Sequence, residues 1–133
     1  MAWFNLVSAL IGMVGLTVGG GLGLPTEWLD GTGFASYFWP GVFLGVVVGG
    51  VQALALIAQR GRFQAVWGMH AAAGLVMMIW IFAEIAIILA WSPLHGIYFA
   101  TGLIQTVLAV LALGAWPSPF LLRSAETAPR SHA

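Results

Sequence analysis

Four long apolar runs alternate with short polar segments along the chain, and apart from Glu84 these runs contain no charged residue. The runs cover residues 3–24, 40–59, 63–91 and 96–116. Because a helix needs about 20 apolar residues to cross the hydrocarbon core of a bilayer, each run is long enough for one span. The pattern predicts an all-α membrane protein in which residues 1–117 form four transmembrane helices packed as an up-and-down bundle. Residues 118–133 are expected to be a disordered tail.

The breaks between the runs carry signals that end helices. Pro40 opens the second run at a position where a helix tolerates proline, and Arg60-Gly61-Arg62 closes that run. The third run is longer than a hydrocarbon core of about 30 Å requires, so we expect its helix to tilt or to protrude. A cleaved signal peptide is the rival interpretation of the first run. We disfavour it because no Lys or Arg precedes the apolar residues.

The four arginines determine the predicted orientation, since short cytoplasmic loops are enriched in Arg and Lys. Arg60 and Arg62 lie between the second and third runs, Arg123 and Arg130 lie in the tail, and the chain has no lysine. In a four-span chain these segments share one side of the membrane with the N-terminus, so both termini are expected in the cytoplasm. Arginine in place of lysine, with abundant Ala, Gly and Val, is typical of a high-GC bacterium. We therefore expect a multi-pass protein of the bacterial inner membrane.

Composition excludes several classes of function. Hydrophobic residues make up 61% of the chain and charged residues 6%, whereas about 25% of the residues in soluble proteins are charged. The expected surroundings are the lipid bilayer, and a formal net charge of 0 argues against a nucleic-acid partner. Because the chain has no cysteine, disulfides and thiolate metal sites are excluded. We expect no cofactor, no metal and no enzymatic activity, since no catalytic motif is present.

The longest connection, residues 25–39, is rich in aromatic rings. These are Trp28, Phe34, Tyr37, Phe38 and Trp39. Aromatic side chains collect at the level of the lipid headgroups, so the favoured interpretation is an interfacial belt that anchors the helices on either side. The alternative interpretation is a lid over a ligand-binding site.

Glycines recur at every fourth position in the first two runs. The first run carries Gly15, Gly19 and Gly23, and the second carries Gly41, Gly45 and Gly49. Stripes of small residues let helix backbones approach closely in lipid, where van der Waals packing rather than the hydrophobic effect drives association. The two stripes could pack against each other, or one of them could pack against a second copy of the protein.

Glu84 is the one acid inside a span, where an ionised carboxylate costs at least about 2.5–3.5 kcal/mol. If the third and fourth helices form a hairpin, Glu84 lies level with the part of the fourth helix that carries three polar residues on one face. These are Tyr98, Thr101 and Gln105. We expect these residues to donate hydrogen bonds to Glu84, and we expect its carboxyl group to be protonated. It could titrate in a transporter or channel, or it could simply join two helices.

His70 lies on nearly the same face of the third helix as Glu84 but nearer the cytoplasm. Folding the second and third helices about Gly61 brings Gln52 level with His70, so a Gln52–His70 hydrogen bond is predicted. If His70 held a haem, a second axial ligand would ordinarily be required, and a metal ion would require further ligands. No residue that could supply such a ligand lies at a suitable spacing from His70.

Two hypotheses for function follow. The first is a protein without catalytic activity that packs in the membrane as a homo-oligomer or as a subunit of a larger membrane complex. The second is a proton-linked small transporter or channel that uses Glu84. The four-span layout is similar to that of the small multidrug transporters, but that family carries its essential glutamate in the first span, and the first run here has no acid.

Overall fold

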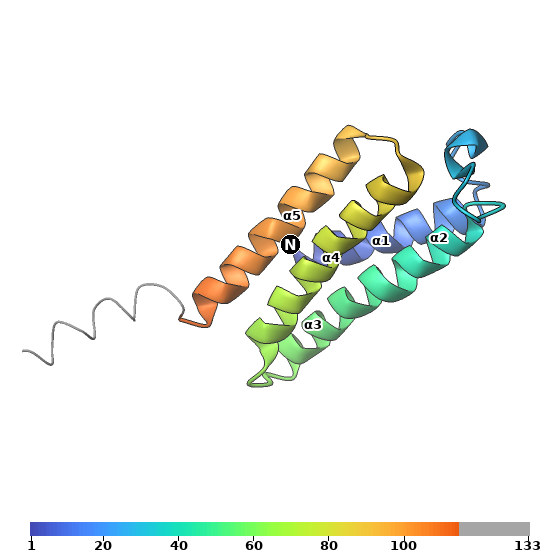
Figure 1. Cartoon of the computed structure of the whole chain (residues 1–133). Coiled ribbons are helices and arrows are strands. Elements are labelled where there is room, and N and C mark those ends of the chain that lie inside the picture. Colours follow the sequence, from blue (N-terminus) through green and yellow to red (C-terminus); the bar gives the residue numbers. More distant parts are fainter. Residues whose placement is uncertain (115–133) are drawn as a thin grey trace, which may run out of the picture.

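The computed structural model of the protein describes residues 1–114, and within this range it contains helices and no strands (Figure 1). The elements in chain order are α1 (Ala2–Thr17), the 3₁₀ turn η1 (Thr26–Leu29), α2 (Phe38–Phe43), the π-helical segment η2 (Leu44–Gly49), α3 (Gly50–Arg60), α4 (Val66–Ile88) and α5 (Pro93–Ala112). Because α2, η2 and α3 follow one another without a break, they form one long helix, and apart from the turn η1 residues 1–114 fold as four helices. The predicted all-helical class is confirmed.

Three of these helices are long and apolar enough to cross a membrane. They are Phe38–Arg60, Val66–Ile88 and Pro93–Ala112. The helix α1 has 16 residues, which at about 1.5 Å per residue gives a length of about 24 Å. Apolar helices were therefore placed correctly by the hydrophobic pattern, but the first is shorter than the other three.

The expectation of a first helix extending to residue 24 is wrong, because α1 ends at Thr17. The chain then turns through Gly20, Gly21 and Gly23, whose φ angles are 62°, 92° and 74°. Glycine reaches these positive angles without steric cost and loses more conformational freedom in a helix than any other residue. A glycine-rich apolar segment that reads as helix in a hydropathy pattern is therefore a folded turn here.

The predicted break at residues 92–95 is the N-terminal cap of α5. The Ser92 side chain accepts a hydrogen bond from the Leu94 backbone N–H, and His95 Nδ1 accepts one of 2.9 Å from the Ser92 N–H. Pro93 occupies the first turn, where its missing N–H is not needed. The fourth helix consequently begins at residue 93 rather than at 96. The expected tail at 118–133 lies outside the described residues.

Each helix packs antiparallel to the next, so that α1 lies along the α2–η2–α3 helix, α3 lies beside α4, and α4 makes its most extensive contact with α5 (Figure 1). By contrast, α1 and α5 barely touch. Arg60 at the end of α3, Arg62 in the turn between α3 and α4, and the C-terminal end of α5 lie at one end (Figure 1). The segment containing η1 and the turn between α4 and α5 lie at the other end (Figure 1).

Two different sets of glycines allow the close helix contacts. Gly41, Gly45 and Gly49 face α1, where a Cβ atom added at Gly41 would lie 2.7 Å from Leu16 Cβ. The closest backbone approach joins α4 and α5, since a Cβ added at Gly74 would lie 2.6 Å from the Gly102 carbonyl oxygen. The sequence did not single out that pair.

The first glycine stripe does not form as expected. Gly19 and Gly23 lie beyond the end of α1, and Gly15 faces Leu22 of the turn that folds back on it. The helix cannot present the three glycines on one face because it ends before the second of them.

Candidate functional site

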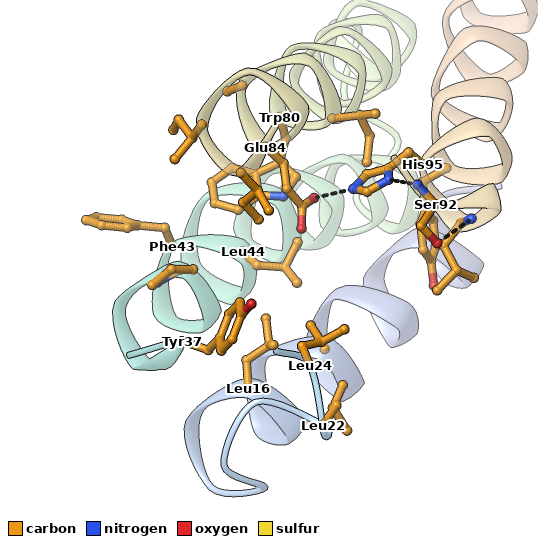
Figure 2. Close-up of a pocket in the computed structure, with 18 of the residues that line it drawn as sticks. Leu16, Leu22, Leu24, Tyr37, Phe43, Leu44, Trp80, Glu84, Ser92 and His95 are labelled. Atoms are coloured by element: carbon orange, nitrogen blue, oxygen red, sulfur yellow. Dashed lines mark hydrogen bonds and ion pairs between the residues drawn. The ribbon is translucent and has the colours of Figure 1, made fainter. Parts of the chain in front are cut away.

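A cavity of about 600 Å³ lies between α1, the first part of the α2–η2 helix, α4 and α5 (Figure 2). Its walls are mainly apolar, with Gly12 and Leu16 from α1, Leu44 from η2, and Met77 and Ile81 from α4. The helices α1 and α5 have few contacts with each other, and residues of both line the cavity. Its volume is in the usual range of small-molecule sites, which runs from about 300 to 1,000 Å³.

The connection between α1 and α2 covers one side of the cavity. Leu24, Trp28, Leu29 and Phe34 of this connection line it. The Tyr37 hydroxyl donates a 2.6 Å hydrogen bond to the Pro25 carbonyl oxygen, which ties the two ends of the connection together. Burial raises the pKa of Tyr37 above its ordinary value, so this hydroxyl keeps the proton that it donates. The aromatic connection, residues 25–39, thus covers the cavity in the position of a lid.

Glu84 places its carboxyl group at the cavity wall, beside His95 (Figure 2). Its Oε2 atom lies 3.9 Å from His95 Nε2, which is beyond hydrogen-bonding distance. The Glu84 side chain is 31% exposed, so the carboxyl group can be reached from outside the helices. No role at a site was predicted for His95, which completes the N-terminal cap of α5 together with Ser92.

The predicted hydrogen bonds from Thr101 and Gln105 to Glu84 are wrong. Thr101 Oγ1 donates to Asn5 Oδ1, and Gln105 Nε2 donates to Gln52 Oε1, each over 2.9 Å. The contact of Gly74 with Gly102 sets the register of α4 and α5, and this register brings Glu84, close to the end of α4, opposite His95. The third expected partner, Tyr98, lines the same cavity as Glu84.

Another polar group at this wall lacks a partner. The indole nitrogen Nε1 of Trp80 is buried and has no hydrogen-bond partner among residues 1–114. Trp80 and His95 lie on the two sides of the Glu84 side chain (Figure 2). A buried N–H group without an acceptor costs about 1–3 kcal/mol, so an acceptor that enters the cavity would be stabilised there.

Nearer the other end of the helices, buried amides form a layer that links all four of them. Asn5 Nδ2 donates to Gln105 Oε1 over 2.9 Å, Gln105 also bonds to Gln52, and Gln52 Nε2 donates to the Ala73 carbonyl oxygen over 3.4 Å. Asn5 and Gln52 are fully buried. Asn5 was not among the predicted site residues, although an amide inside an apolar run is itself a signal for an interhelical hydrogen bond.

The predicted Gln52–His70 hydrogen bond is wrong. His70 Nε2 lies 3.0 Å from Gln59 Oε1 instead, because Gln59 sits near the turn that joins α3 to α4 and is closer to the start of α4. His70 does not line the cavity. Gln52 belongs to the amide layer.

No protein family model, curated protein sequence or solved structure matches this chain. Within residues 1–114 no three His, Asp or Glu side chains are grouped so that they could hold a metal ion. The residues that converge on the cavity are Glu84, His95, Trp80, Tyr37 and Tyr98.

Proposed function

We propose that the chain is a four-span protein of the bacterial inner membrane, without catalytic activity, that binds a lipophilic small molecule in the Glu84 cavity. Binding is linked to a proton on Glu84, as in a small transporter or channel. One observation carries this proposal: an acid inside an apolar helix lines a cavity of ligand size, with its carboxyl group 3.9 Å from His95. Ionisable residues inside membrane spans generally serve ion or substrate pathways.

The surface of the helices supports membrane insertion. Large apolar side chains such as Ile79, Phe82 and Leu108 are more than half exposed, at 64%, 65% and 56%, and such side chains are stabilised by lipid rather than by water. The short helix α1 would be accommodated by local thinning of the bilayer. Arg60 and Arg62 at one end favour a cytoplasmic location for that end.

The assembly hypothesis has lost its specific support. It rested on two glycine stripes with more packing surface than one hairpin needs. The first stripe is interrupted by the end of α1, and the second already faces α1 within the same chain. Association with another copy or with another membrane protein is therefore a secondary proposal.

The test is whether occupancy of the cavity depends on the protonation of Glu84. Two lipophilic probes would be titrated into the protein in nanodiscs between pH 5 and pH 9, with empty nanodiscs subtracted: decylubiquinone, which is neutral, and tetraphenylphosphonium, which is a cation. We expect saturable binding of one probe with an affinity that changes with pH in the wild-type protein. The Glu84→Gln variant should bind without that pH dependence.

Glu27→Gln is the matched control, because Glu27 lies in η1 and does not line the cavity. It should keep the wild-type pH dependence. The proposal fails if neither probe binds saturably, or if Glu84→Gln and wild type show the same dependence on pH.

A further inference from the structure

We infer that the occupant of the cavity is a neutral lipophilic molecule whose polar end presents a carbonyl oxygen, as in a quinone, and that Trp80, His95 and Glu84 donate hydrogen bonds to it. This inference rests on the proposed function and specifies its ligand. It follows from the direction of each hydrogen-bonding group at the cavity wall.

His95 is a donor to the cavity because its other nitrogen is already an acceptor. The Ser92 backbone N–H donates to Nδ1 over 2.9 Å, so Nδ1 carries no proton. In the neutral imidazole the proton is therefore on Nε2, the atom that faces Glu84.

Trp80 is the second donor, since an indole N–H can only donate. Its Nε1 is buried without an acceptor among the described residues, and it lies across the Glu84 side chain from His95 (Figure 2). Two donors thus have fixed positions around one point of the wall. The hydroxyl group of Tyr37 adds no third donor, because its proton goes to the Pro25 carbonyl oxygen.

These fixed donors decide between two ligand classes. An ammonium or phosphonium group could pair with an ionised Glu84, but it cannot accept a hydrogen bond from Trp80 or His95, and it would lie beside the positive ends of their N–H groups. A carbonyl oxygen has two lone pairs, so it can accept from two of the three donors, which are the Trp80 N–H, the His95 N–H and a protonated Glu84. The carbonyl oxygen therefore offers the acceptor that these donors lack, whereas the cation offers none.

The apolar part of the cavity fits the remainder of such a molecule. Leu16, Leu44, Met77 and Ile81 surround the space beyond the polar atoms. The volume of about 600 Å³ accepts a ring with a short chain. A neutral molecule also enters from the bilayer without the cost of desolvating a charge.

The sign of the pH dependence tests this inference. A carbonyl ligand needs a protonated Glu84, so decylubiquinone should bind more weakly as the pH rises and Glu84 ionises. A cation would bind more tightly over the same change. The other titratable groups on the cavity wall are Tyr37 from the connection and His95 and Tyr98 from α5, and Glu84→Gln separates their contribution from that of Glu84.

A second readout isolates the Trp80 hydrogen bond. Trp80→Phe should weaken decylubiquinone binding by roughly threefold to tenfold, which is the loss of one hydrogen bond. Trp91→Phe, a change outside the cavity at a residue 69% exposed, should leave the affinity unchanged. In a ¹H–¹⁵N spectrum the indole signal that disappears in Trp80→Phe should move on titration of the wild type. Nanodiscs of ether-linked lipids keep lipid ester carbonyls out of the experiment.

The possible results separate this inference from the proposed function. If tetraphenylphosphonium binds in a Glu84-dependent manner and decylubiquinone does not, the carbonyl inference is overturned and the proposed function stands. Decylubiquinone binding that is unchanged in Trp80→Phe and does not weaken with rising pH also overturns the inference. If neither probe binds saturably, both proposals are rejected.

Discussion

Asn5 donates a 2.9 Å hydrogen bond to the side-chain oxygen of Gln105, and so joins α1 to α5 although these helices barely touch elsewhere. Both side chains are buried, at 0% and 4% exposure. Toward the connection between α1 and α2, the two helices separate and the Glu84 cavity lies between them. The amide layer thus joins α1 to α5, and the cavity lies between these helices on the side of the layer that faces the connection.

A double-mutant cycle of Asn5→Ala and Gln105→Ala should give a coupling free energy of about 0.5–2 kcal/mol, the range found for interhelical hydrogen bonds in membranes. Each single change leaves a buried partner unsatisfied, so each should also lower the free energy of unfolding. Equilibrium unfolding in detergent micelles measures both quantities. Thr17→Val is the control, because the Thr17 hydroxyl bonds to Met13 within its own helix. Strictly additive effects of the two alanine changes would contradict the proposed link.

Gly74→Ala should destabilise the protein by about 1–3 kcal/mol, the usual cost of overpacking. The added methyl group would meet the Gly102 carbonyl oxygen at 2.6 Å, and a helix backbone cannot move aside as a side chain can. The matched control is Gly68→Ala on the same helix, where no atom lies within 4 Å of the added methyl group. Thermal unfolding of the two variants should differ clearly. Equal stability would show that α4 and α5 do not approach each other at Gly74.

The chain has no cysteine, which allows its topology to be measured with single thiols. Gln64→Cys lies in the turn between α3 and α4, and Ala35→Cys lies in the connection before α2. We expect a membrane-impermeant maleimide to label Ala35→Cys in intact cells and Gln64→Cys only after the membrane is opened. The reverse pattern would invert the orientation derived from the arginines, and labelling of both in intact cells would remove a span.

The hydrophobic pattern was sufficient to place the helices, because burial in lipid requires long apolar segments whatever their partners. It was insufficient at the end of α1, where the conformational freedom of Gly20, Gly21 and Gly23 overrides their apolar context. The hydrogen-bond partners of the polar side chains could not be predicted from the hydrophobic pattern either. They depend on helix register, and the register of α4 and α5 is set by Gly74 and Gly102.

The consequence for the site was specific. With an assumed hairpin register, Glu84 was expected to meet Thr101 and Gln105, whereas the contact through the two glycines brings it to His95. Glu84 itself was identified correctly as a candidate from its cost in a membrane. The cavity beside it is a property of the distance between α1 and α5, which no single-helix pattern contains.

The most direct test of the account is infrared spectroscopy of the protein at neutral pH. A protonated carboxyl group absorbs apart from ionised ones, and we expect such a band in the wild type and in Glu27→Gln but not in Glu84→Gln. The band should shift when decylubiquinone fills the cavity, because the Glu84 proton then takes part in a new hydrogen bond. If wild type and Glu84→Gln are identical in the protonated-carboxyl region, the proposal is contradicted, since Glu84 would then be ionised and could not donate to a ligand.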